Sequence, residues 1–291
     1  MCGYGSGGSD MREAMHYQVF PEKLDVQCML CPHRCVILSG KAGKCSVRKN
    51  EKGSLISINY GQLTAINLDP VEKKPLFHFM PGTTTLSIGS FGCNLRCPYC
   101  QNYHISMGNP GTRNVTPEIL INRAIEMGIP SISYTYNEPT VYYEYVYETA
   151  KLAKQKGLSN IMVTNGYIEE APLKELLPFI DAMNVDLKAF SEKTYQSFCG
   201  GDLDTVLRSI SSAHSQCHIE ITTLLVTDMH KLNELERMFQ WISGLSPQIP
   251  LHLSRYFPSH QYHASMTPKS WMEQVKKTAL KYLDNVYLGN I

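Results

Sequence analysis

The pattern of apolar and polar positions divides the chain near residue 80. From residue 83 onward, short apolar runs alternate with segments in which apolar residues recur every three or four positions. The runs are typical of buried strands and the segments of amphipathic helices. Residues 1–80 are instead irregular and rich in Cys, Gly and Lys, with one candidate strand pair at 55–66. We therefore expect a cysteine-rich N-terminal extension over 1–80 and a core domain over 81–291.

The expected core domain contains six predicted strands, each of which ends in a turn or a polar residue. They lie at 83–91, 131–136, 160–166, 181–190, 217–226 and 250–257. Helices are expected between them, at 116–128, 140–157, 191–198, 231–243 and 267–283. Strands that alternate with helices predict parallel βα units and an α/β fold. Six units favour a partial (β/α)6 TIM-like barrel, with an open sheet as the alternative, and ligands bind at the C-terminal ends of the strands in both.

Charge and hydropathy exclude several classes of protein. The 27 Lys and Arg balance 26 Asp and Glu without a long basic run, so binding to nucleic acid or anionic lipid is not indicated. No apolar run approaches the roughly 20 residues of a membrane helix. The first ten residues, MCGYGSGGSD, lack the features of a secretory signal and have the composition of a disordered lead-in. We expect a cytoplasmic protein, in which clustered cysteines more often bind metals than form disulfides.

Three of the ten cysteines lie directly after the first predicted strand, in CNLRCPYC at 93–100. Cys93, Cys97 and Cys100 should therefore lie at the mouth of the barrel. Three thiolates on a cubane iron–sulfur cluster leave one iron without a protein ligand, so that iron can bind a substrate or cofactor. The alternative is a structural zinc ion with His104 as the fourth ligand.

Polar side chains follow the later strands in the motifs TYNEP, VTNG and VDLKAF. These motifs supply Asn137, Glu138, Asn165, Asp186 and Lys188. Asp186 and Lys188 are alternate residues and share one face, so both can reach one ligand. Simple turns and a surface ion pair are the alternative explanations.

Three further polar residues interrupt apolar strands, where a charge is costly unless it is partnered. They are Glu220 in HIEITTLL and His252 and Arg255 in PLHLSRYFP. A structural role is the simpler explanation for each. We include His252 and Arg255 among the candidates for contact with the cofactor or substrate.

A second cysteine group lies in the N-terminal extension. Cys28, Cys31, Cys35 and Cys45 are separated by 2, 3 and 9 residues, and His16 or His33 could replace one of them. Four ligands can form a closed zinc site or an auxiliary [4Fe–4S] cluster, and zinc is narrowly favoured. A closed site would stabilise a segment that lacks a core of its own. Four free thiols are the alternative.

The loop CxxxCxxC, with the aromatic Tyr99 before its last cysteine, resembles the cluster loop of the radical SAM superfamily. Other stretches are similar to one group within it, the pyruvate formate-lyase activating enzyme-like or AmmeMemoRadiSam-system group. These stretches are CMLCPHRCVILSGKAGKCSVR, EKKPLFHFMPGTTTLSIGSFGCNLRCPYCQN, TYNEP, VTNG, NVDLKAF, PLHLSRYFP and VYLGN. Together they span nearly all of the chain from about residue 25.

The resemblance implies that Cys93, Cys97 and Cys100 hold a [4Fe–4S] cluster whose free iron binds S-adenosylmethionine (SAM). An electron from this cluster would cleave SAM to a 5′-deoxyadenosyl radical, which abstracts hydrogen from a substrate. The residues expected to bind SAM are Tyr99, Asn137, Glu138, Asn165, Asp186 and Lys188. Activating enzymes tend to carry an Asp that helps to hold a monovalent cation where this chain has Val163, so a cation site is not expected. Members of the group continue past VYLGN with a further cysteine pair, whereas this sequence stops at Ile291.

The family suggests that the substrate is a glycyl-radical partner protein and that flavodoxin or ferredoxin donates the electron. One alternative is radical modification of a small molecule or of another protein side chain. An alternative from a different class is a zinc-binding interaction protein without SAM chemistry.

Overall fold

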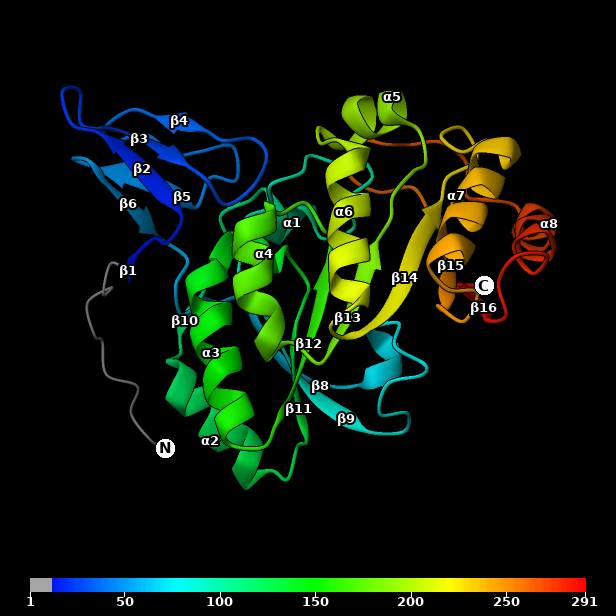
Figure 1. Ribbon diagram of the computed structural model, residues 1–291, viewed down its shortest axis with the longest axis horizontal. Helices are drawn as coiled ribbons and strands as arrows, with labels where there is room; N and C mark the ends of the chain where they lie inside the picture. Colours follow the sequence, from blue (N-terminus) through cyan, green and yellow to red (C-terminus); the bar gives the residue numbers. More distant parts are fainter. Residues whose placement is uncertain (1–11) are drawn as a thin grey trace.

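The computed structural model describes residues 12–291, so the expected lead-in at 1–10 lies outside the described residues. The main element is an eight-stranded sheet that curves into a partial barrel (Figure 1). All neighbouring strands in it are parallel except the first pair, β8 and β9. The strands, in chain order, are β8 (Ala65–Pro70), β9 (Thr84–Gly89), β11 (Ser131–Tyr134), β12 (Ser159–Thr164), β13 (Ala182–Asp186), β14 (His218–Leu225), β15 (Leu251–Arg255) and β16 (Val286–Gly289).

The six predicted strands are confirmed as β9 and β11 to β15. Their interior residues are almost all buried, as strands covered on both faces require. Two strands were not predicted. β8 pairs antiparallel with β9, and the short β16 adds a parallel strand beside β15. Because β8 ends at Pro70, the predicted boundary at residue 80 leaves one strand of the main sheet in the N-terminal part.

Helices between the strands cover the outer face of the barrel (Figure 1). They are α2 (Pro117–Glu126), α3 (Tyr143–Gln155), α4 (Glu170–Leu176), α6 (Leu203–His214), α7 (Leu232–Leu245) and α8 (Lys269–Ala279). Shorter helical segments are η1 (Val71–Lys73), α1 (Tyr103–Ser106), η2 (Pro139–Tyr142), η3 (Leu177–Phe179), α5 (Glu192–Thr194) and the π-helix η4 (Tyr195–Cys199). The predicted start of α2 is confirmed, because the Thr116 side chain accepts from the Ile119 amide and Pro117 follows it.

The N-terminal region forms two small antiparallel sheets beside α3 and α4 (Figure 1). One contains β1 (Arg12–Glu13), β6 (Ser54–Ser57) and β5 (Arg48–Glu51), and the other β2 (Tyr17–Phe20), β3 (Asp25–Cys28) and β4 (Val36–Ile37). The expected strand pair within 55–66 is wrong. β6 pairs with β1 and β5, whereas β7 (Gln62–Leu63) pairs with β10 (Arg113–Asn114).

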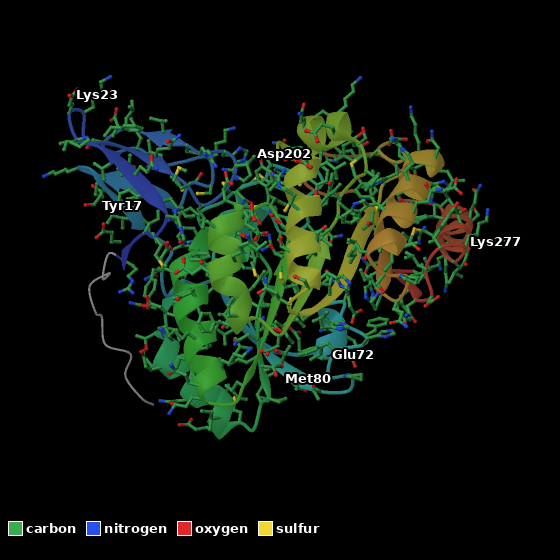
Figure 2. The ribbon with its side chains drawn as sticks, in the orientation of Figure 1. Tyr17, Lys23, Glu72, Met80, Asp202 and Lys277 are labelled. Atoms are coloured by element: carbon green, nitrogen blue, oxygen red, sulfur yellow. The ribbon has the colours of Figure 1, made fainter. Side chains whose placement is uncertain are left out.

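The exposed Lys23 of the N-terminal sheets and Lys277 of α8 lie at opposite ends of the molecule (Figure 2). Between these ends one apolar core is continuous, and it includes Val26 and Leu55 of the N-terminal sheets together with Leu95 and Val141 of the barrel region. Within residues 12–291, no helix is both long enough and apolar enough to cross a membrane.

Candidate active site

A cleft of about 380 Å³ opens at the C-terminal ends of the barrel strands. The structure brings nine of the predicted site residues to this cleft, from the segments that follow β9, β11, β12 and β13. They are Cys93, Cys97, Tyr99, Cys100, Asn137, Glu138, Asn165, Asp186 and Lys188. Residues far apart in the sequence therefore meet because parallel strands end at one edge of the sheet.

The cysteine loop is held tightly against the N-terminal region. Gly92 has a φ of +89°, and a Cβ there would lie 2.7 Å from the Val47 side chain and 2.9 Å from the Cys45 carbonyl oxygen. Only glycine combines this backbone conformation with such a close approach. The Leu95 amide donates to Cys93 Sγ at 3.4 Å. The loop therefore has a fixed path before any cofactor binds.

Glu138 joins the ends of two strands. Its carboxylate is 4% exposed and accepts hydrogen bonds from the Thr140 amide (3.0 Å), Thr164 Oγ1 (2.7 Å) and the Asn165 amide (2.8 Å). Burial raises the pKa of Glu138, although these donors oppose the shift. With both of its oxygens occupied by protein donors, Glu138 positions the segments after β11 and β12 at the cleft wall.

Two asparagines connect these segments to the cysteine loop. Asn137 accepts from the Ser90 amide at 2.8 Å and donates to the Gly92 carbonyl oxygen at 3.0 Å. Asn165 Nδ2 donates to Asn94 Oδ1 at 2.9 Å and lies 3.7 Å from Cys93 Sγ. The amide side chains thus hold the first cysteine in register with the neighbouring strand ends.

Asp186 and Lys188 form an ion pair at the end of β13, with Lys188 Nζ 3.1 Å from Asp186 Oδ2. Burial lowers the pKa of Lys188, but the Asp186 carboxylate and the negative charges of Cys97 and Cys199 in their ionised form together raise it well above its usual value. Lys188 therefore carries its positive charge at the cleft, next to a negative charge on Asp186. A ligand with both an amino and a carboxylate group suits this pair.

The two remaining predicted residues do not line the cleft. His252, at the second position of β15, lies with its Nε2 2.6 Å from Glu220 Oε2. Arg255 donates from Nε to the Thr267 carbonyl oxygen at 2.7 Å and lies over the Phe257 ring. In this structure the contacts of both residues are with structural partners outside the cleft, and their contact with the cofactor or substrate stays a prediction.

The sequence analysis missed two polar residues that line the cleft, Lys74 and Tyr136. Lys74 lines the cleft and donates to Asp69 Oδ2 at 2.8 Å, and the Tyr136 hydroxyl donates to the same oxygen at 2.5 Å. Tyr136 has a φ of 70°, and a Cβ on Gly89 would lie 2.9 Å from its Cβ. Left-handed backbone at a bulky residue is uncommon and is found where the surroundings enforce it. The sequence signal for this group was the pair of lysines in EKKPLF, directly before an apolar stretch.

A family model described as the Radical SAM superfamily matches residues 87–242, which is more than half of the chain. The chain belongs to the radical SAM superfamily. This radical SAM protein is 40% identical over 292 residues to the uncharacterized protein MJ0808 of Methanocaldococcus jannaschii, covering 97% of this chain and 86% of the relative. It is 25% identical over 211 residues to the putative glycyl-radical enzyme activating enzyme MJ1632 of the same organism, covering 69% and 79%.

Solved structures support the radical SAM fold. SuiB of Streptococcus suis bound to SAM matches with a TM-score of 0.55 and 13% identity, covering 68% of this chain and 47% of that one. A radical SAM methyltransferase from Sphaerobacter thermophilus matches with a TM-score of 0.54 and 17% identity, covering 72% and 67%. The predicted partial barrel of radical SAM type is confirmed.

The superfamily implies a [4Fe–4S] cluster and SAM, and the residues at the cleft fit both. Within residues 12–291, Cys93, Cys97 and Cys100 are the only thiols that line the cleft. A three-thiol set leaves one iron open to a further ligand. The ion pair of Asp186 and Lys188 adds both signs of charge to the lining of the same cleft. Membership of this superfamily favours SAM chemistry over the alternative of a zinc-binding interaction protein.

Proposed function

We propose that this protein is a radical SAM enzyme that abstracts a hydrogen atom from its substrate at the cleft. The observation that carries the proposal is the convergence of three thiols on one loop with an ion pair and two asparagines on adjacent strand ends. A cluster held by these thiols would supply one electron to SAM, whose carbon–sulfur bond would break to give methionine and a 5′-deoxyadenosyl radical.

In this proposal the residues of the chain bind and orient. Cys93, Cys97 and Cys100 are the cluster ligands. Lys188 attracts the carboxylate of SAM as a point charge, and Asp186 attracts its amino group. Tyr99 is buried within the loop, with its hydroxyl 3.4 Å from Cys199 Sγ, and would help to exclude water from the cluster ligands.

Asn137, Glu138 and Asn165 act mainly as positioning residues. Their hydrogen bonds fix the segments after β9, β11 and β12 relative to one another. These hydrogen bonds keep the shape of the cleft constant, so that bound SAM and substrate would be held in a productive orientation. Their side chains also line the cleft in which SAM would bind.

For the substrate, we propose a partner protein that is converted to its glycyl-radical form, with flavodoxin or ferredoxin as the electron donor. Relatives named putative glycyl-radical enzyme activating enzymes, at 25% identity, support this choice. Radical modification of a small molecule or of another protein side chain is the alternative.

The proposal is tested by anaerobic purification of the wild type and of Cys97→Ala, with iron and sulfide measured before dithionite and SAM are added. We expect about four irons in the catalytic site of the wild type and release of 5′-deoxyadenosine. Cys97→Ala should lose those irons and the product together. Cys217→Ala, which replaces a cysteine outside both groups, is the matched control and should retain both.

A second variant separates SAM binding from cluster binding. Lys188→Met should keep the irons of the wild type but bind SAM about 10-fold to 100-fold more weakly, because it loses one charge-assisted contact. Equilibrium dialysis with labelled SAM measures the change. A wild type that contains only zinc, or that leaves SAM intact when reduced, would contradict the proposal.

A further inference from the structure

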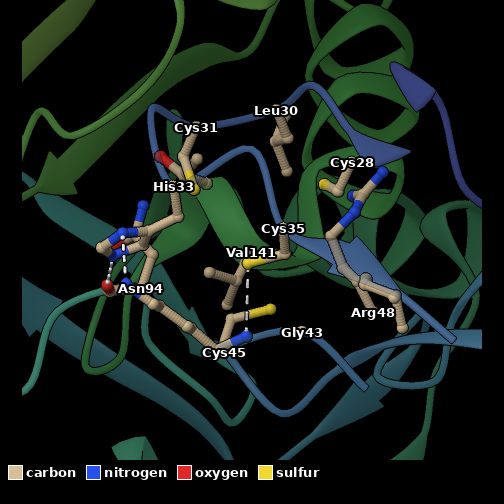
Figure 3. A pocket seen from close by; sticks show the side chains of 13 residues that line it. Cys28, Leu30, Cys31, His33, Cys35, Gly43, Cys45, Arg48, Asn94 and Val141 are labelled. Atoms are coloured by element: carbon tan, nitrogen blue, oxygen red, sulfur yellow. Dashed lines mark hydrogen bonds between the residues drawn. The ribbon is translucent and has the colours of Figure 1, made fainter. Parts of the chain in front are cut away.

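The N-terminal cysteine group surrounds a second, small cavity of about 20 Å³ (Figure 3). Cys28 ends β3, and the loop from β3 to β4 returns so that the Cys28 amide donates to the Cys35 carbonyl oxygen at 3.0 Å. Cys31 lies within this loop, and Cys45 comes from the turn before β5. All four thiols line the one cavity, together with apolar side chains such as Leu30 and Val141.

A backbone amide contacts one of the four sulfur atoms. The Lys44 amide donates to Cys35 Sγ at 3.5 Å. The Leu95 amide has the same relation to Cys93 in the cleft. Donors placed in this way support thiolates that act as metal ligands.

Arg48 adds an independent observation. It is 2% exposed and lines the cavity, and its Nη1 lies 2.9 Å from Glu144 Oε1. Its Nε is fully buried and has no hydrogen-bond partner among the residues that the structure describes. A buried donor without an acceptor is costly, so its position beside the cavity points to an acceptor that forms there when a metal binds. Metal-bound thiolate sulfur is such an acceptor, and its negative charge suits the guanidinium.

We propose that Cys28, Cys31, Cys35 and Cys45 bind one zinc ion in a closed four-thiolate site that holds the catalytic cysteine loop in place. The cavity has room for about one small sphere, which suits a single ion better than a cubane of four irons and four sulfides. Within residues 12–291, no three potential ligands already stand at metal-binding spacing. Binding therefore includes rotation of the thiols toward the common cavity.

The zinc site contacts the catalytic loop directly. His33 Nε2 lies 2.7 Å from the Asn94 carbonyl oxygen, and Asn94 lines the cavity immediately after Cys93. On the other side, Arg96 donates to the Lys44 carbonyl oxygen and to Ser46 Oγ. This positioning role rests on the proposed function, whereas the zinc site itself does not.

The test measures zinc and iron by mass spectrometry in anaerobically purified full-length wild type, Cys45→Ser, Cys97→Ala and Cys217→Ser. We expect one zinc per chain in the wild type, in Cys97→Ala and in Cys217→Ser, and none in Cys45→Ser. Cys45→Ser should also bind less catalytic iron than the wild type. Full iron content and full 5′-deoxyadenosine release in zinc-free Cys45→Ser would overturn the positioning role alone.

Cys97→Ala separates this inference from the proposed function, because its zinc should persist when the catalytic iron is gone. About four irons in Cys97→Ala, absent from Cys45→Ser, would overturn zinc in favour of an auxiliary cluster. If Cys97→Ala contains no metal at all, the proposed metal site in the N-terminal cysteine group is overturned. If Cys45→Ser does not fold, wild type produced with cobalt in place of zinc provides the second measurement. Thiolate-to-cobalt charge-transfer absorption supports the site, and its absence overturns it.

Discussion

Glu220 shows how one buried charge is made stable. It has no exposed surface, and its two oxygens contact His218, His252 and the backbone amides of Phe77 and His78 at 2.6–3.0 Å. Burial raises its pKa, but these four donors outweigh burial and lower the pKa of Glu220 to about 2. The carboxylate thereby attaches the segment after η1 to the beginnings of β14 and β15.

We expect Glu220→Gln to lower the free energy of unfolding at pH 7 by about 2–4 kcal/mol, because an amide cannot accept from all four donors. The folded-state pKa near 2 lies below the ordinary value of 4.5, so the ionised carboxylate stabilises the fold above pH 4.5. This stabilisation is lost as the pH falls toward 2. Urea denaturation between pH 7 and pH 3 measures both effects.

The variant should lose less stability than the wild type between pH 5 and pH 3. Glu273→Gln, on the exposed side of α8, is the control and should change the free energy of unfolding by less than about 0.5 kcal/mol. Equal stability of Glu220→Gln and wild type at pH 7 would show that the four contacts contribute nothing.

At the scale of elements, one buried ion pair attaches β5 to α3. Arg48 opens β5, and its Nη1 lies 2.9 Å from Glu144 in the first turn of α3, where both side chains are almost fully buried. The Met15 amide also donates to Glu144 at 2.7 Å. Acidic residues are favourable in the first turn of a helix, which adds to this contact.

Glu144→Gln should lower the free energy of unfolding by about 3–5 kcal/mol, because it removes the carboxylate that contacts the buried Arg48 guanidinium directly. Glu148→Gln is the matched control, one turn later on α3 and with a side chain that is 30% exposed. It should lose less than about 1 kcal/mol. Chemical denaturation of both variants gives the comparison, and equal losses would argue against a special role for the buried pair.

At the scale of the whole molecule, the N-terminal sheets and the barrel share one apolar core. The buried Val26 and Leu55 belong to the same cluster as residues of β12 and β13 such as Met162 and Val185. Parts that share a core tend to unfold together. The N-terminal region therefore stabilises the barrel instead of acting as an independent appendage.

We expect β3, β5, β12 and β13 to unfold in one cooperative step. Hydrogen exchange measured by mass spectrometry across a urea series should give their slowest amides the same midpoint and the same denaturant dependence. Exchange of β3 and β5 at clearly lower urea would show that the N-terminal sheets open alone. The exposed first residues of α8, Lys269 and Ser270, serve as the comparison. Their amides should exchange by local fraying at every urea concentration.

The repeated βα pattern could be predicted from the sequence alone, because buried strands and amphipathic helices leave local periodicities of about 2 and 3.6 residues. The sequence also predicted the cysteine loop, because Cys93, Cys97 and Cys100 lie within eight positions of one another. The polar residues of TYNEP, VTNG and VDLKAF could be placed at one cleft because parallel strands end together. The strands β8 and β16 of the main sheet were not predicted.

Only the tertiary structure decided which partners these residues meet. His252 and Arg255 are residue types that are common at functional sites, yet their hydrogen bonds are to Glu220 and Thr267, outside the cleft. The contacts of Tyr136 with Asp69 and of Arg48 with Glu144 join residues 67 and 96 positions apart. A local sequence pattern cannot predict such contacts, because they depend on how separate elements pack. The sequence therefore determined the elements and the cysteine loop, and packing determined which polar side chains reach the cleft.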